Sequence, residues 1–345
     1  MKQSFIAGMD VSFLDEIEQA GGAFYEAGVR KDCLEIMKDN GVNSIRLRLW
    51  NEPPGGMCNL ERTLVMAKRI KEKGLHFLLD FHYSDVWADP AHQTKPKAWE
   101  GLTFDRLSQA VYNFTKESLE KLKAQGTLPD MVQVGNEITP GMLWDDGKVD
   151  GQLDTDAQWE RFAALVKQGI AAVRHVDPSI NVMIHIDRGG DNASSRKFYD
   201  RFERHGVEFD TIGLSFYPWW HGTLDDLRNN LHDLAERYGK EIIVVETAYP
   251  WTLDTSEGRF IVEQEEQLHV GYPATPSGQT QYLADFVKII QETPGGLGAG
   301  FYYWEPCWIP AKKEWSVGHE NNWANLTMFD FKGNKLESLE LFRSS

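Results

Sequence analysis

Short apolar runs recur along the chain, and a longer segment with helical spacing of its apolar residues separates each run from the next. Eight runs are rich in Val, Ile, Leu and Phe and do not alternate with polar residues, which is typical of strands buried on both faces. The predicted strands cover residues 5–11, 44–50, 76–82, 131–137, 181–186, 210–217, 241–248 and 300–305. This pattern predicts a parallel sheet covered by helices.

The segments between these runs predict helices over residues 30–40, 60–73, 104–124, 156–175, 193–205, 223–238 and 278–293. Glycine stands directly after several of them, as in Gly41, Gly74 and Gly239, where it can close a helix and release the chain into the next strand. Repeated strand-then-helix units without an internal linker predict the α/β class and one (β/α)₈ TIM barrel, a single domain over residues 1–345.

Polar residues gather at the ends of the predicted strands, where barrel enzymes build their active sites. They are Asp10, Arg46, Arg48, Asp80, His82, Asn136, Glu137, His185, Asp187, Tyr217, Glu246, Trp304 and Glu305. Any one of them could instead cap a helix or satisfy a buried hydrogen bond. Their occurrence together at the ends of the predicted strands favours a functional site there. The long connections after the third, fourth, seventh and eighth strands are expected to form the walls of a substrate cleft.

Two glutamates end apolar strands, Glu137 after Met131-Val-Gln-Val-Gly-Asn and Glu246 after Ile242-Ile-Val-Val. An unpaired buried carboxylate is costly, so such residues are either ion-paired or functional. Retaining glycosidases need two carboxyl groups roughly 5–5.5 Å apart, one as nucleophile and one as acid and then base. The pattern therefore favours this pair as the catalytic residues, with a structural ion pair as the alternative.

Tryptophan supports a sugar ligand, because an indole face stacks on the apolar face of a pyranose. Of the 12 tryptophans, all but Trp159 fall at predicted strand ends or in the loops beyond them. Some of these only pack loops, an interpretation that suits four in particular. They are Trp99, Trp144, Trp315 and Trp323.

Other chemistries have weaker support. No His-Glu-x-x-His helix, phosphate-binding loop or dinucleotide fingerprint is present. His82 and His185 lack an evident third metal ligand, so we expect them to hydrogen-bond to catalytic carboxylates or to substrate. The three cysteines are too few for a disulfide scaffold.

The net charge and the hydropathy of the chain limit the classes of binding partner that we expect. Asp and Glu total 52 against 36 Lys and Arg, for a formal net charge of -16. Without a basic cluster, nucleic acid is an unlikely partner and a neutral ligand is favoured. No apolar span reaches about 18 residues, so no membrane span is predicted. The first residues show no export signal.

The strand-end motifs resemble those of glycoside hydrolase family 53, the arabinogalactan endo-β-1,4-galactanases. The matching stretches begin at Gly8 (Gly-Met-Asp-Val-Ser), Ile45 (Ile-Arg-Leu-Arg-Leu-Trp-Asn-Glu-Pro), Asp80 (Asp-Phe-His-Tyr-Ser-Asp-Val-Trp-Ala-Asp-Pro), Val134 (Val-Gly-Asn-Glu-Ile), Val244 (Val-Val-Glu-Thr-Ala-Tyr-Pro) and Tyr303 (Tyr-Trp-Glu-Pro). The Trp-Ala-Asp-Pro stretch from Trp87, which continues to Gln93 and Trp99, is particularly specific, whereas Asn-Glu at the end of the fourth strand is shared by a whole clan of retaining barrels.

The resemblance implies internal cleavage of β-1,4-galactan, a pectin side chain, with retention of configuration. By the same analogy Glu137 is the acid/base and Glu246 the nucleophile, Asn136 holds the sugar 2-hydroxyl, and Arg46 lowers the pKa of the nucleophile. The other expected substrate-binding residues are Asp10, His82, Asp85, Trp87, His185, Tyr217 and Trp304. Two alternatives remain open: a related barrel acting on mannan, glucan or xylan, and a carbohydrate-binding barrel without activity.

The family analogy also implies secretion and suggests a calcium site, which bacterial members form between the loops after the seventh and eighth strands with a close Asp/His/Asn run. Residues 253–273 contain no such run. We therefore expect no metal and no other cofactor, although Asp254, Glu257 and Glu263 are oxygen donors of the kind calcium takes. We also expect the enzyme to act as a monomer.

Overall fold

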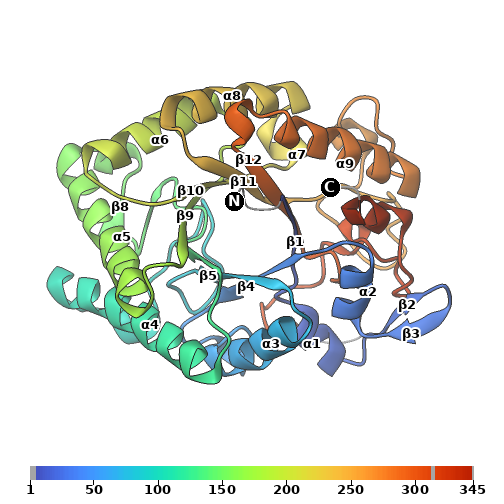
Figure 1. The fold of residues 1–345 in the computed structure, drawn as a ribbon, viewed down its shortest axis with the longest axis horizontal. Coiled ribbons are helices and arrows are strands. Elements are labelled where there is room, and N and C mark those ends of the chain that lie inside the picture. The colour runs from blue at the N-terminus through green and yellow to red at the C-terminus, as the bar shows by residue number, and fades with distance from the viewer. Residues whose placement is uncertain (1–4, 312–314, 344–345) are drawn as a thin grey trace.

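All eight predicted strands form, and they close edge to edge into a parallel barrel (Figure 1). The computed structural model describes residues 5–311 and 315–343. The barrel strands are β1 (Ile6–Asp10), β4 (Ser44–Leu49), β5 (His76–Phe81), β6 (Met131–Val134), β9 (Asn181–Ile186), β10 (Thr211–Ser215), β11 (Glu241–Thr247) and β12 (Gly298–Trp304). They lie in the order β1-β12-β11-β10-β9-β6-β5-β4, and β1 pairs with β4 to close the ring.

The seven predicted helices also form, and Figure 1 shows them outside the barrel. They are α2 (Cys33–Asp39), α3 (Leu60–Glu72), α4 (Phe104–Gln125), α5 (Asp156–Val176), α6 (Asn192–Arg204), α8 (Leu224–Tyr238) and α9 (Pro276–Gln291). Local signals fix their ends. The Asn59 side chain accepts a hydrogen bond from the backbone of Arg62 at the start of α3, and Gly239 ends α8 in the left-handed conformation.

The predicted helix over 30–40 starts too early. Residues Val29–Lys31 form β3, which pairs antiparallel with β2 (Phe24–Glu26) through a turn at Ala27 and Gly28, both with positive φ. The helix begins only after Asp32, whose side chain caps it. Two-residue turns with positive φ favour a hairpin, and this local preference overrides the helical spacing.

Several short elements were not predicted from the sequence. They are α1 (Leu14–Gln19), α7 (Pro218–His221), the strand pair β7 (Gly141–Met142) and β8 (Gly147–Lys148), and the 3₁₀ turns η1 (Pro54–Gly56), η2 (Lys97–Trp99), η3 (Gly151–Leu153), η4 (Glu265–Gln267), η5 (Pro294–Gly296), η6 (Ala324–Leu326) and η7 (Glu337–Arg343). Of these, η7 packs against α9 after the last strand, where a regular barrel has its eighth helix.

Two cores hold the barrel. The larger lies between the strands and the helices, and the smaller lies within the barrel, formed by Ile6, Leu78, Met131, Met183, Ile243, Val245 and Tyr302. The inner core is so tight that a Cβ atom on Gly8 would lie 2.4 Å from the Tyr302 ring. Towards the carboxyl ends of the strands the interior becomes polar, which is where the cleft lies.

Within the described part of the chain, no helix is both long and apolar enough to cross a lipid bilayer.

Candidate active site

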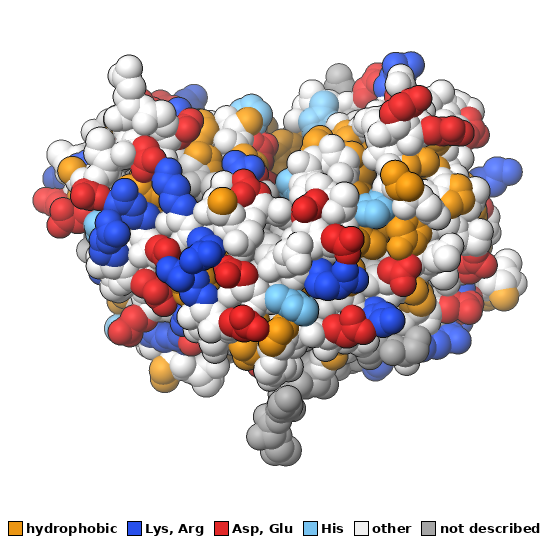
Figure 2. Space-filling view, turned by 90° about the horizontal axis from the view of Figure 1, so that it is seen from above, with side chains coloured by type: hydrophobic (Ala, Val, Ile, Leu, Met, Phe, Trp, Pro, Cys, Tyr) orange, Lys and Arg blue, Asp and Glu red, His pale blue; other side chains and the backbone are white. Residues whose placement is uncertain are grey.

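A cleft of about 830 Å³ opens at the carboxyl ends of the barrel strands. The side view in Figure 2 shows it as a notch in the upper rim of the molecule, with apolar and histidine side chains along it. Five indoles belong to its lining, namely Trp87, Trp220, Trp304, Trp308 and Trp323. Aromatic faces interleaved with polar groups suit a sugar polymer.

Arg46 on β4 is the cationic centre of the cleft floor and is wholly shielded from solvent. Its Nη1 donates to Asp10 Oδ2 at 2.8 Å and to Glu246 Oε1 at 2.9 Å. Its Nη2 donates to Asp80 Oδ2 at 2.9 Å. Three carboxylates thus converge on one guanidinium, whose rigid fork fixes their positions relative to each other.

Both oxygens of Glu246 have a hydrogen-bond donor. Arg46 binds Oε1, and the Tyr217 hydroxyl donates to Oε2 at 3.0 Å. Burial raises the pKa of Glu246 to about 7, with Arg46 opposing the shift and Asp10 and Asp80 adding to it. Arg46 therefore lowers the pKa of Glu246, as expected from the resemblance. The pKa nevertheless lies above its ordinary value, because burial and the two like charges outweigh the one cation.

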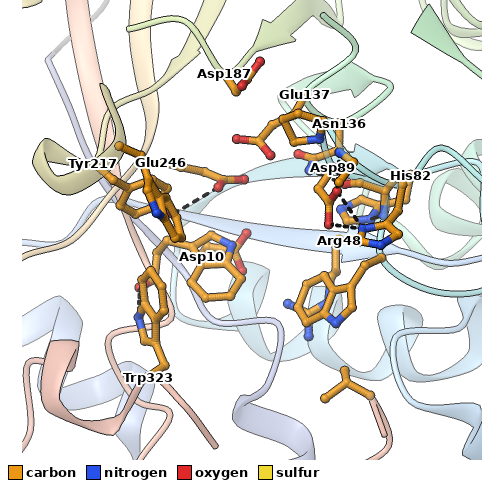
Figure 3. Close-up of a pocket in the computed structure, with 18 of the residues that line it drawn as sticks. Asp10, Arg48, His82, Asp89, Asn136, Glu137, Asp187, Tyr217, Glu246 and Trp323 are labelled. Atoms are coloured by element: carbon orange, nitrogen blue, oxygen red, sulfur yellow. Dashed lines mark hydrogen bonds and ion pairs between the residues drawn. The ribbon is translucent and has the colours of Figure 1, made fainter. Parts of the chain in front are cut away.

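Glu137 leaves the barrel ladder through a bend. The last paired residue of β6 is Val134, and Gly135 and Glu137 then adopt positive φ values of 85° and 47°. The prediction of a strand up to residue 137 is wrong for this reason. The bend carries the Glu137 side chain into the cleft, towards the space that Glu246 also faces (Figure 3).

The Glu137 carboxyl group lies in an environment that favours its protonated form. It is buried, and burial together with the charges of Glu246 and Asp187 raises its pKa well above the ordinary value. Its Oε1 accepts a hydrogen bond of 2.6 Å from Ser215 Oγ, which opposes the shift. The cleft thus holds one carboxyl group whose surroundings favour its protonated form and a second that is paired with a cation.

Asn136 is held from three sides. Its Oδ1 accepts from Arg46 Nη2 at 2.8 Å and its Nδ2 donates to the Ala88 carbonyl at 2.8 Å. The Gln93 side chain also donates to the Asn136 backbone carbonyl at 2.8 Å. Because Arg46 can only donate, the amide orientation of Asn136 is defined.

His82 is held in one tautomer. Its Nδ1 accepts from the Trp50 indole at 3.0 Å and from the Ala88 amide at 3.1 Å. Its Nε2 then carries the proton and donates it to Asp80 Oδ2 at 3.0 Å. His82 therefore supports the carboxylate cluster around Arg46 while it also lines the cleft.

Most of the residues predicted from the sequence meet in this cleft. Those that line it are Asp10, Arg46, His82, Trp87, Asn136, Glu137, Tyr217, Glu246 and Trp304.

Asp85 and His185 do not line the cleft. Asp85 accepts hydrogen bonds from the backbone amides of Glu52 and Lys97, so it braces two loops. His185 is fully buried; its Nδ1 accepts from the Glu137 backbone amide at 3.4 Å, and it reaches the Glu137 carboxyl group through Ser215. In both cases the prediction of a substrate-lining position is wrong. Asp85 lies in the loop beyond β5, whose path sets its direction, and the position of His185 near the end of β9 does not fix which way its side chain faces.

Other lining residues were missed or misjudged. Trp323, expected only to pack a loop, lines the cleft, as do Asp89 and Trp220. Ser215 and Gln133, which contact the Glu137 and Arg46 groups, were not selected. A signal existed for Ser215, since it stands two residues before Tyr217 and alternate strand residues share a face.

Comparisons with known proteins place these features in a family. The sequence profile of glycosyl hydrolase family 53 matches residues 6–342. An "uncharacterized protein in bgaB 5'region" from Niallia circulans is 67% identical over 99% of this chain and 94% of that protein. The endo-beta-1,4-galactanase of Bacillus subtilis (strain 168) is 33% identical over 99% of this chain and 86% of its own.

A solved structure agrees with this grouping. The Ignisphaera aggregans GH53 catalytic domain superposes with a TM-score of 0.92 at 42% identity, covering 99% of this chain and 96% of its own. Sequence, fold and cleft thus lead to one conclusion: the chain belongs to glycosyl hydrolase family 53 and is a glycoside hydrolase.

Proposed function

We propose that this enzyme is an endo-β-1,4-galactanase that hydrolyses β-1,4-galactan and type I arabinogalactan by a retaining double displacement. The observation that carries the mechanism is the pair of unlike carboxyl groups in one cleft: Glu137 in an environment that keeps its proton, and Glu246 bound by Arg46 and Tyr217. The printed name of the Bacillus subtilis relative supports the substrate.

In the first step Glu137 donates its proton to the glycosidic oxygen while Glu246 attacks the anomeric carbon. The bond from that carbon to the leaving-group oxygen breaks, and a bond to the Glu246 carboxylate forms. Arg46 and Tyr217 hold the carboxylate in position for attack.

In the second step Glu137, now ionised, takes a proton from water as the water oxygen attacks the anomeric carbon. The bond to Glu246 breaks, the sugar leaves with its original configuration, and Glu137 regains its proton. One residue can serve as acid and then base because loss of the charge on Glu246 during the intermediate removes a cause of the raised pKa of Glu137.

The remaining contacts support substrate-binding roles for further residues of the cleft. Asn136 and the nucleophile Glu246 are bound by the two terminal nitrogens of the same guanidinium, that of Arg46, which suits a hydrogen bond from Asn136 to the 2-hydroxyl of the sugar. The indoles of Trp87 and Trp304 lie 5.9 Å apart and offer faces for stacking. Asp10 and His82 complete the floor as hydrogen-bonding groups.

We further propose that catalysis needs no metal ion. Two of the acidic residues in the loop after β11 already have partners: Glu263 accepts from the Phe260 amide and pairs with Arg259 at 3.0 Å, and Asp254 accepts from the Ser256 backbone amide. The test is dialysis against EDTA, which should leave activity and melting temperature unchanged. A loss of either that added Ca²⁺ restores would contradict the proposal.

The experiment for the main proposal is hydrolysis of linear β-1,4-galactan beside mannan, xylan and cellulose, with reducing ends and product sizes followed in time. Early mixed galacto-oligosaccharides, with the β-anomer formed first by proton NMR, are expected. Activity on another polymer would keep the two-glutamate mechanism and reject the substrate. An α-anomer formed first would reject retention, and inactivity on every polymer would favour a binding protein.

A further inference from the structure

A chain of buried side chains links Arg46 to Glu137 without passing through the cleft. Arg46 Nε and Nη2 contact Gln133 Oε1 at 3.2 and 3.1 Å, and Gln133 Nε2 contacts His185 Nδ1 at 3.0 Å. His185 Nε2 contacts Ser215 Oγ at 2.8 Å. Ser215 Oγ lies 2.6 Å from Glu137 Oε1. Gln133, His185 and Ser215 are all fully buried, so water does not supply alternative partners.

The direction of every bond in this chain follows from its first member. Arg46 can only donate, so the oxygen of the Gln133 amide faces it and the NH₂ group faces His185. His185 Nδ1 must then accept, and the backbone amide of Glu137, 3.4 Å away, adds a second donor at the same atom. Asn136 Oδ1 also lies 3.0 Å from Nδ1, but its two lone pairs already accept from Arg46 Nη2 at 2.8 Å and from Gln133 Nε2 at 3.0 Å.

The later members follow in turn. With Nδ1 accepting, the neutral imidazole of His185 carries its proton on Nε2 and donates it to Ser215 Oγ. Burial and the charge of Arg46 lower the pKa of His185 well below its ordinary value, so the ring stays neutral. Ser215 has one proton, and Glu137 Oε1 is the acceptor left for it.

We propose that Ser215 is a positioning residue that keeps Glu137 Oε1 an acceptor and thereby places the catalytic proton on Oε2, with the direction of this relay set by Arg46. One guanidinium then orders both carboxyl groups: it binds the nucleophile directly and orients the acid through three intervening side chains. The proposal rests on the proposed function of Glu137 as acid and base.

The catalytic consequence concerns a single proton. It passes from Glu137 Oε2 to the glycosidic oxygen as the anomeric bond breaks, and a proton from water returns to Oε2 in the second step. Ser215 exchanges no proton with substrate; its hydrogen bond to Oε1 stabilises the carboxylate form and so limits the rise in the pKa of Glu137. The other ionisable groups that act on Glu137 are Glu246 on β11, Asp187 after β9, Asp89 after β5 and Tyr217 after β10.

The test compares Ser215→Ala with Ser215→Thr, which keeps a hydroxyl, and with Ser118→Ala as the matched control. Ser118 is a buried serine on α4 whose Oγ has no hydrogen-bond partner. The substrates are β-1,4-galactan, whose leaving alcohol needs a proton, and 2,4-dinitrophenyl β-galactobioside, whose phenolate leaves without one. The kcat/KM of each is measured against pH.

Ser215→Ala should lose roughly tenfold in kcat/KM on galactan but less than about twofold on the dinitrophenyl substrate, since only the first needs acid catalysis. The alkaline limb of the galactan profile should move to higher pH by roughly half a unit, because the bond that stabilises the ionised form is gone. Ser215→Thr should restore both values, and Ser118→Ala should match the wild type.

Equal losses on the two substrates, or an alkaline limb that does not move, would overturn the proposal. If Ser215→Ala does not fold, ¹⁵N NMR of histidine-labelled wild-type enzyme decides, since a proton on His185 Nδ1 would reverse the relay and reject it. A wild-type enzyme that cleaves neither galactose substrate would instead reject the proposed function, and the NMR result would still test the relay.

Discussion

Two arginines on β4, two positions apart, are buried in different surroundings. Arg46 meets the side chains of three carboxylates and two amides, Asp10, Asp80, Glu246, Gln133 and Asn136. Arg48 has one carboxylate partner, Glu305, at 2.8 Å. Its Nε and Nη2 atoms are buried, and no residue among those the structure describes forms a hydrogen bond with them.

Aromatic rings take the place of acceptors around Arg48. Its guanidinium carbon lies 4.3 Å from the ring centre of Phe13, 5.0 Å from that of Trp50 and 4.5 Å from that of Trp87. Ring faces attract a cation and leave its position along the face loosely defined, whereas hydrogen bonds fix both distance and direction. We infer that Arg46 organises the chemistry and that Arg48 joins the loops around the cleft.

The largest expected effect on kcat comes from replacing the nucleophile that Arg46 binds. Glu246→Gln keeps the size of the side chain and a hydrogen-bond acceptor but cannot attack carbon, so kcat should fall on the order of 10⁴-fold. Galactotetraose binding, measured by calorimetry, should persist. Turnover near the wild-type rate would reject Glu246 as nucleophile.

Arg46→Lys should have the next largest effect, because an ammonium group cannot serve five side chains in a planar fork. We expect kcat to fall roughly 10²-fold. Since Arg46 lowers the pKa of Glu246, the acid limb of the pH profile should also move to higher pH. A variant with lower stability but an unchanged pH profile would contradict the assigned role.

Arg48→Lys should affect stability more than activity, the opposite of what we expect for Arg46→Lys. The ammonium group can still pair with Glu305 but loses the stacked contacts, so we expect a loss of about 2 kcal/mol in the free energy of unfolding, measured with urea. The kcat of the folded variant should change less than about threefold. A large fall in kcat with unchanged stability would contradict the inference that Arg48 joins the loops and that Arg46 organises the catalytic groups.

The smallest effect is on stability and concerns Glu137. Its folded pKa lies above the unfolded value, so the wild type loses stability as pH rises from the unfolded pKa through the folded one. Glu137→Gln carries no such charge, and its melting temperature should exceed that of the wild type by about 2 °C at pH 7. The gain in melting temperature should shrink towards pH 4 and below, where the Glu137 carboxyl group is protonated in the unfolded state as well as in the folded state. A gain that persists there would not arise from this ionisation.

The barrel was predictable because its signals are local and repeated. Continuous apolar runs and glycines after helices mark the units, and each of the eight predicted segments overlaps a strand of the barrel, although β6 ends earlier than predicted. The short elements were not predictable in the same way. The β2–β3 hairpin depends on positive φ at Ala27 and Gly28, a backbone property that hydrophobic spacing does not report.

The candidate site was predictable in part for the same reason. Residues that end strands on the inner face, such as Glu246 and Tyr217, meet in the cleft. Asp85 lies beyond the end of its strand, where the loop path decides its direction, and it turns to the backbone of Glu52 and Lys97 instead.

The barrel, the family motifs and the residue types at the strand ends can be read from the amino-acid sequence, because each depends on neighbours along the chain. The environments of those residues arise only in the folded protein. The fold buries Glu246 so deeply that the pKa of Glu246 rises despite the nearby Arg46. It also brings Ser215 into hydrogen-bond contact with Glu137, although the two residues are 78 positions apart in the sequence. Ionisation and hydrogen-bond direction depend on burial and on contacts between distant strands, and these exist only once the barrel has closed.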